Sequence, residues 1–166
     1  MYVDTKGDCF VKKIMFVCHG NICRSPMAEF IFKDMLKKQG IESGYVVTSS
    51  ATSTEEIWNG IGNPIYPPAK AELLKHGINC DSKRAVQLEK SDYDKYDIFL
   101  AMDSMNIRNI SRIFGTDTLG KVHKLMDLTD RPGDVADPWY SGKFDVAYRD
   151  INDGCIALLK KLQEDT

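Results

Sequence analysis

The stretch from Ile14 to Ser25 constrains the fold of this chain more than any other part of the sequence. Four apolar residues at 14–17 run into a short polar segment that contains Gly20 and Asn21, and a long amphipathic segment follows. This order predicts a buried strand, a tight loop and a helix. We therefore expect an α/β domain with Cys18 at the carboxyl end of the strand, the edge where such sheets bind ligands.

The loop at 18–25 combines features that bind an oxyanion. Ser25 and Pro26 are typical of a helix N-cap and first turn, which places free backbone N–H groups and the positive end of the helix dipole beside the loop. Arg24 adds a guanidinium that can bind two phosphate oxygens. The same positive surroundings favour the thiolate of Cys18, a nucleophile for phosphorus. The loop therefore predicts a phosphate site and a phosphocysteine intermediate.

The spacing of Cys18 and Arg24 is weak evidence by itself, and the context makes it specific. A strand precedes the pair, Gly20 and Asn21 stand where a positive φ is easily adopted, and Ser-Pro opens a helix. The alternative is that Cys18 and Cys23 are buried apolar residues of a structural turn. We favour the phosphate site, because Gly-Asn and Arg at a strand-to-helix turn have no packing purpose.

A second candidate segment, 129–143, is rich in Asp, Gly and Pro and contains Asp137. A phenolate leaving group must be protonated as its P–O bond breaks, so a carboxylic acid has to face Cys18. Trp139 and Tyr140 offer flat surfaces that can sandwich an aryl phosphate. Asp-Pro alone is an ordinary turn signal, and it becomes a candidate acid through its pairing with the loop at 18–25.

The rest of the chain alternates strands and helices. Strands are predicted at 14–17, 45–49, 97–102 and 121–125, and helices at 26–39, 68–76, 104–114 and 144–162, with Ser104 as an N-cap, Gly40 and Gly77 as helix ends and a long loop at 50–68. This alternation predicts a single doubly wound domain, a four-stranded parallel sheet flanked by helices. Residues 1–12 lack periodicity and are expected to form a flexible or loosely packed N-terminal extension of the domain at 13–166.

Composition excludes several classes of protein. The 166 residues, 43% of them hydrophobic, suit one core, and a net charge of −2 argues against nucleic acid as a partner. No apolar run reaches membrane-spanning length and no cleavable leader is visible, so we expect a cytoplasmic protein without membrane contact. Five irregularly spaced cysteines do not form a secreted disulfide framework. A zinc site on Cys18, His19 and Cys23 lacks a second ligand pair, so we expect neither a metal nor a cofactor.

The segment Cys-His-Gly-Asn-Ile-Cys-Arg-Ser-Pro at 18–26 resembles the phosphate-binding loop of the low-molecular-weight protein tyrosine phosphatases. Asp-Pro-Trp-Tyr at 137–140 resembles their general-acid loop, and the resemblance spans about residues 12–162. It implies the phosphatase-I-like fold and hydrolysis of phosphotyrosine in proteins or aryl phosphates. It makes Cys18 the nucleophile, Arg24 the phosphate ligand and Asp137 the general acid and base. The other phosphate-binding positions are then His19, Gly20, Asn21, Ile22 and Cys23.

The resemblance also implies supporting roles. It places His76 with Asn21, Ser25 and Ser49 in a network that shapes the loop, whereas the sequence alone makes His76 a residue that offsets a helix dipole. Ser25 would hydrogen-bond the sulfur. Trp58 would form a wall of the substrate pocket, its alternative role being to pin the loop at 50–68 onto the core.

Two further positions have two interpretations each. Cys23 is either the partner of Cys18 in a reversible disulfide, which the resemblance favours, or a small packing residue. Asp103 resembles a family acid, and a cap or turn role is an equal alternative. We expect a monomer or weak dimer.

Three other functions remain open. A thiol-relay arsenate reductase needs resolving cysteines near 80–95, where only Cys80 occurs. A phosphoarginine phosphatase resembles this chain, but that subgroup has a small Thr where this sequence has Ile22. A non-catalytic phosphate-binding module would lack Asp137. The sequence departs from the family pattern at His19, at Trp139 in place of a Tyr, and at 83–85, which matches a basic family segment only loosely.

Overall fold

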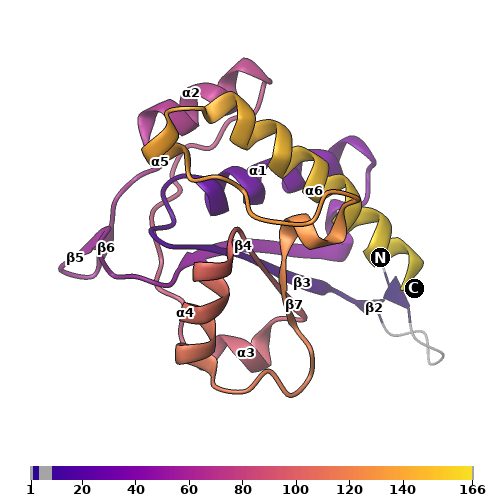
Figure 1. The fold of residues 1–166 in the computed structure, drawn as a ribbon. Coiled ribbons are helices and arrows are strands. Elements are labelled where there is room, and N and C mark those ends of the chain that lie inside the picture. The colour runs from indigo at the N-terminus through magenta and orange to yellow at the C-terminus, as the bar shows by residue number, and fades with distance from the viewer. Residues whose placement is uncertain (1, 4–8, 166) are drawn as a thin grey trace.

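The computed structural model describes residues 2–3 and 9–165 and is built around one parallel sheet. Its strands, in spatial order, are β4 (Tyr45–Ala51), β3 (Lys12–Cys18), β7 (Ile98–Ala101) and β8 (Val122–Lys124). All neighbouring strands pair in parallel, with helices on both faces (Figure 1). The predicted four-stranded parallel sheet is confirmed.

The central strand β3 is buried on both sides. Ile14 and Phe16 belong to one apolar cluster, whereas Met15 and Val17 belong to the cluster on the opposite face. A continuous apolar run is what a strand covered on both faces requires. Cys18 is the last residue of this strand and lies opposite Ala51 of β4, at the carboxyl edge of the sheet.

Helices form a layer on each face of the sheet. The first layer contains α1 (Arg24–Lys38), α2 (Pro67–Lys75) and α6 (Phe144–Glu164), and the second contains α3 (Asp92–Lys95) and α4 (Ser104–Phe114). Short helices are η1 (Glu42–Gly44), η2 (Leu125–Leu128) and α5 (Pro138–Ser141). Gly40 and Gly77, with φ of 68° and 75°, follow α1 and α2 as predicted.

Two predicted helix caps are wrong. The N-cap of α1 is Cys23 and no side chain caps it, because Ser25 is buried within the first turn and its hydroxyl contacts Cys18 instead. The N-cap of α4 is Asp103, not Ser104. The Asp103 carboxylate accepts the N–H of Asn106 at 2.8 Å, and the Asn106 side chain accepts the N–H of Asp103 at 3.2 Å, a capping box.

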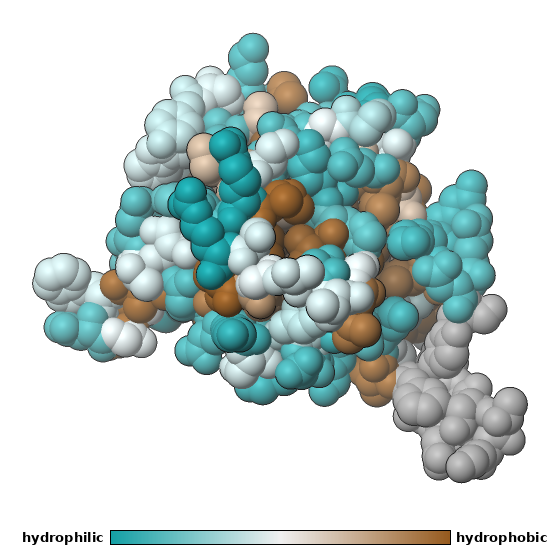
Figure 2. All heavy atoms as spheres, turned by 60° about the horizontal axis from the view of Figure 1, so that its bottom comes forward, coloured by the Kyte–Doolittle hydropathy of each residue, from teal (hydrophilic) through white to brown (hydrophobic). Residues whose placement is uncertain are grey.

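The predicted loop at 50–68 contains a small hairpin. Strand β5 (Ile57–Trp58) pairs antiparallel with β6 (Ile61–Gly62), and Asn59 and Gly60 between them have φ of 50° and 75°. An Asn-Gly pair with positive φ is the usual two-residue hairpin turn. The hairpin projects from the body at the left of Figures 1 and 2.

At the N-terminus, β1 (Tyr2–Val3) pairs antiparallel with β2 (Cys9–Phe10). Of the extension predicted at 1–12, residues 1 and 4–8 lie outside the described residues, and Lys12 already belongs to β3. The division at residue 12 stays a prediction. No helix within 2–3 and 9–165 is long and apolar enough to cross a bilayer.

Candidate active site

The loop after β3 curls around a buried thiol. The sulfur of Cys18 lies 3.0 Å from the hydroxyl of Ser25 and accepts the backbone N–H of Asn21 at 3.3 Å. The Ser25 oxygen accepts the side-chain amide N–H of Asn21 at 2.8 Å, and the acceptors within reach of its own proton are the Cys18 sulfur and, at 3.5 Å, the carbonyl of Ser50. The predicted contact between Ser25 and Cys18 is therefore present in the structure.

Asn21 holds the loop in shape. Its φ of 59° lies in the left-handed region, which Asn tolerates. Its side-chain Nδ2 donates to the hydroxyls of Ser25 and Ser49, the latter at 2.9 Å, and its side-chain Oδ1 accepts the backbone N–H of Val86 at 3.0 Å. The side chain thus ties the loop to β4 and to the segment after α2.

Two charged residues that we did not predict complete this network. The hydroxyl of Ser49 donates to Oε1 of Glu29 at 2.6 Å. Nζ of Lys83 lies 3.3 Å from this carboxylate oxygen and donates to the backbone carbonyl of Ser49 at 3.0 Å. Glu29 is 4% exposed, and a carboxylate buried to this degree requires such partners. The loose family match at 83–85 was the only signal for Lys83.

The predicted role of His76 in this network is wrong. His76 is the C-cap of α2, where it faces α6, and its ring stacks on Tyr148 with 3.6 Å between centroids. Its Nε2 lies 3.4 Å from Glu72. The partners of Asn21 are Ser25, Ser49 and Val86 instead.

Arg24 is the buried cation of the site. It is 3% exposed, and its Nη1 donates to the carboxylate of Asp103 at 2.7 Å and to the carbonyl of Val135 at 2.8 Å. Its Nη2 lies 3.5 Å from the carboxylate of Asp137. Burial opposes the charge, but Cys18 and the two carboxylates outweigh it, so the pKa of Arg24 is raised.

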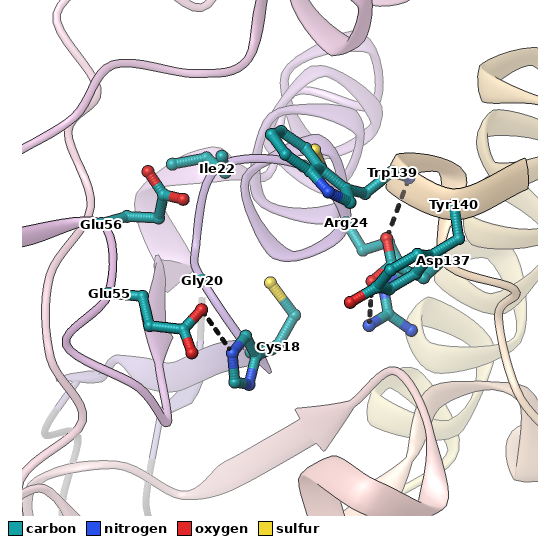
Figure 3. A pocket seen from close by; sticks show the side chains of 11 residues that line it. Cys18, Gly20, Ile22, Arg24, Glu55, Glu56, Asp137, Trp139 and Tyr140 are labelled. Carbon is teal, nitrogen blue, oxygen red and sulfur yellow. Dashed lines mark hydrogen bonds and ion pairs between the residues drawn. The ribbon is translucent and has the colours of Figure 1, made fainter. Parts of the chain in front are cut away.

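Asp137 reaches the site from the loop that opens α5. It is the N-cap of that helix, and its Oδ1 accepts the N–H of Trp139 at 3.1 Å. Figure 3 shows the carboxylate of Asp137 and the thiol of Cys18 directed toward the same pocket. Residues about 120 positions apart in the sequence are brought together because Cys18 ends β3 and the loop that carries Asp137 is held beside it by the bond from Arg24 to Val135.

The pocket contains most of the predicted site residues. Its lining consists of Cys18, His19, Gly20, Ile22, Cys23, Arg24, Glu55, Glu56, Asp137, Trp139 and Tyr140. Trp139 is half-exposed and packs on Tyr66, with 4.6 Å between ring centroids, and Tyr140 is exposed. Among the residues that the structure describes, no group of three His, Cys, Asp or Glu is arranged to hold a metal ion.

Trp58 does not line this pocket, so its predicted role as a pocket wall is wrong. It lies on β5 with 80% of its surface exposed, because the hairpin carries it away from the loop at 18–25 and from the core. Its alternative role in pinning the loop is excluded by the same exposure. The pocket instead receives Glu55 and Glu56, which we did not predict.

Cys23 is a buried free thiol in the same loop. Burial, with smaller contributions from Cys18 and nearby carboxylates, raises its pKa to about 12. Cys18, Cys80 and Cys155 are also free and buried. The disulfide between Cys18 and Cys23 stays a prediction.

The fold and the site together define a class: an α/β enzyme in which a buried cysteine and arginine of the loop after β3 share a pocket with a carboxylate. A family model described as low molecular weight phosphotyrosine protein phosphatase matches residues 13–166. The low molecular weight protein-tyrosine-phosphatase YfkJ of Bacillus subtilis is 36% identical over 154 residues, covering 92% of this chain and 96% of its own. The low molecular weight phosphotyrosine protein phosphatase of Gallus gallus is 34% identical over 157 residues, which cover 91% of this chain and 96% of its own.

Solved structures agree with this result. The crystal structure of YfkJ has a TM-score of 0.88 at 34% identity and covers 94% of this chain and 97% of that one. The structure of SP-PTP from Streptococcus pyogenes has a TM-score of 0.80 at 34% identity and covers 92% of this chain and 93% of that one. The chain belongs to the low-molecular-weight phosphotyrosine protein phosphatase family, a class of phosphoric monoester hydrolases. The resemblance predicted from 18–26 and 137–140 is confirmed.

Proposed function

We propose that this enzyme hydrolyses phosphotyrosine, in proteins or as small aryl phosphates, through a phosphocysteine on Cys18. The observation that carries the proposal is the shared pocket of Cys18, Arg24 and Asp137. The family and the names of the relatives support phosphotyrosine as the substrate. Trp139 and Tyr140 at the rim provide aromatic surface for the phenyl ring.

In the first step, the sulfur of Cys18 attacks phosphorus as the P–O bond to the phenol breaks. Arg24 and the backbone N–H groups of the loop bind the equatorial oxygens and stabilise their charge. The bonds to Asp103 and Val135 fix the guanidinium before substrate arrives. Asp137, in its acid form, gives its proton to the departing oxygen.

In the second step, water replaces the sulfur. Asp137, now a carboxylate, takes a proton from the water, which attacks phosphorus as the S–P bond breaks. The Ser25 hydroxyl, 3.0 Å from the sulfur, stabilises the departing thiolate by donating a hydrogen bond. The products are inorganic phosphate and free Cys18.

Two substitutions test the proposal. Cys18→Ser should abolish turnover while inorganic phosphate still binds. Asp137→Asn should lower kcat by about 10²–10⁴ for an aryl phosphate with a poor leaving group. Normal turnover by the Cys18→Ser protein would refute the mechanism.

Two observations favour phosphotyrosine over the other substrates. Ile22 lines the pocket, and the similar phosphoarginine phosphatases have a smaller residue, Thr, at this position. Cys80, the thiol that an arsenate relay would need, is 3% exposed and packs in the core, and burial raises its pKa. Comparing phosphotyrosine, phosphoarginine and phosphoserine peptides with arsenate as substrates would separate these functions.

We also propose that Cys23 protects Cys18 from over-oxidation by forming a reversible disulfide with it. Both thiols belong to one curved loop and line the same pocket. Mass spectrometry after mild peroxide should find a bridge between residues 18 and 23. Sulfinic acid on Cys18 without a bridge would refute this role.

A further inference from the structure

One wall of the pocket is acidic. Glu55 and Glu56 precede β5 and line the same pocket as Cys18. Figure 3 shows them across the pocket from Asp137 and Tyr140. A side chain at Gly20 would lie 3.2 Å from Cγ of Glu56, so Glu56 packs directly against the phosphate loop. The acidic wall is therefore part of the pocket itself.

Both carboxylates keep capacity for a further cation. Oε2 of Glu55 lies 3.0 Å from Nε2 of His19, and Oε2 of Glu56 accepts the amide of Asn63 at 2.8 Å. Within 2–3 and 9–165, neither Oε1 atom has a hydrogen-bond or ion-pair partner. The side chains of His19 and Glu55 are 47% and 69% exposed, and an ion pair this exposed is weak. A substrate cation can therefore approach Glu55 readily.

The wall keeps a negative charge when the phosphate site is filled. Arg24 is buried against Asp103 and is opposed by the bound phosphate, so it does not offset the wall. His19, even when positively charged, balances one of the two glutamates. A peptide that carries phosphotyrosine thus meets net negative charge on this side of the pocket.

The peptide on either side of the phosphotyrosine has to cross the mouth of the pocket. Neighbouring residues in an extended chain are about 3.3–3.6 Å apart, so those one or two positions away pass over the walls. We propose that Glu55 and Glu56 make this enzyme prefer phosphotyrosine peptides with Lys or Arg at those positions and disfavour Asp or Glu there. The inference rests on the proposed phosphatase activity.

The test compares two phosphotyrosine peptides that differ only in flanking Lys or flanking Glu residues. Each exposed charge pair changes affinity by about two- to fivefold, so two carboxylates should give a kcat/KM ratio of about ten at low salt. A Glu55→Gln/Glu56→Gln double variant should bring the ratio close to one. Glu42→Gln, an exposed carboxylate of η1 near the amino end of β4, is the matched control and should keep the full ratio.

Two measurements separate the possible failures. Raising the salt concentration should reduce the wild-type ratio, because screening weakens exposed charge pairs, and this result does not depend on the variants folding. A wild-type ratio near one, or an unchanged ratio in the double variant, overturns the inference if the wild-type enzyme hydrolyses phenyl phosphate. If the wild-type enzyme fails on phenyl phosphate, the proposed function is overturned instead.

Discussion

Nη1 of Arg24 donates a hydrogen bond of 2.7 Å to Oδ2 of Asp103, and the other carboxylate oxygen of Asp103 caps α4 through the N–H of Asn106. The cap role that the sequence left open for Asp103 is therefore present, and the same side chain also fixes the guanidinium of Arg24. A catalytic role for Asp103 stays a prediction. The arrangement anchors the guanidinium, which we propose binds phosphate, to the first turn of a helix in the opposite layer. It ties the position of Arg24 to the stability of α4.

The two roles of Asp103 can be separated by substitution. Asp103→Ala should raise KM for phenyl phosphate about tenfold by freeing the guanidinium, and should lower the free energy of unfolding by about 1–2 kcal/mol by removing the cap. Asp103→Asn keeps a capping oxygen but loses the charge, so it should raise KM with little loss of stability. Steady-state kinetics and urea unfolding measure both effects. A wild-type KM in both variants would contradict the anchoring role.

The pair of Lys83 and Glu29 should matter for both folding and catalysis. Lys83→Met leaves the buried carboxylate of Glu29 with one partner fewer, which should cost about 1–3 kcal/mol of unfolding free energy. Glu29 and Lys83 both hold Ser49, and Ser49 in turn holds the side chain of Asn21 in the loop at 18–25. Loss of Lys83 should therefore lower kcat as well. Lys33→Met is the control: Lys33 contacts the same carboxylate but is 45% exposed, so its loss should cost less than about 1 kcal/mol. Equal effects of the two substitutions would refute a special role for Lys83.

The two tryptophans should differ in their effect on small substrates. Trp139→Ala removes an aromatic wall and should raise KM for phenyl phosphate by about two- to tenfold. Trp58→Ala should leave kcat and KM unchanged, since the side chain stands on the hairpin outside the pocket. The same kinetic assay on both variants decides. A clear loss in Trp58→Ala would place the hairpin over the pocket during turnover.

Cys23 should make the fold sensitive to alkaline pH. Its pKa is raised from an ordinary value of 9.0 to about 12 in the folded protein, so the folded state holds this proton more tightly than the unfolded chain. The free energy of unfolding should therefore fall as pH rises from about 9 toward 12. Urea unfolding at several pH values should show a smaller fall for Cys23→Ala. An identical dependence of the unfolding free energy on pH in the two proteins would contradict the raised pKa of Cys23.

Local patterns predicted the elements well because neighbouring residues determine them. The apolar run at 14–17 gave β3, and Gly40 ended α1 as expected. The network around Asn21 was harder to predict, because it continues through Ser49 to Glu29 and Lys83, which lie in separate parts of the chain. No local pattern indicates that Glu29 is buried. The family resemblance supplied His76 for this network, whereas Lys83 is the basic residue that takes part in it.

The walls of the pocket were predicted on one side only. Trp139 and Tyr140 follow Asp137 closely in the sequence, so predicting Asp137 as the acid also placed these two residues at the pocket. On the other side, the Asn-Gly turn after Trp58 folds the chain into a hairpin that carries this residue outward. Glu55 and Glu56 enter the pocket as a result, and their positions depend on three-dimensional packing that the sequence does not display.

The most direct test of the account is to trap the covalent intermediate. In the Asp137→Asn variant, p-nitrophenyl phosphate has a leaving group that needs little protonation, so the first step continues while the second lacks its base. Acid quenching followed by peptide mass spectrometry should then find one phosphoryl group on Cys18. A phosphoryl group on another residue, or sustained turnover without any phosphorylated Cys18, would contradict the account.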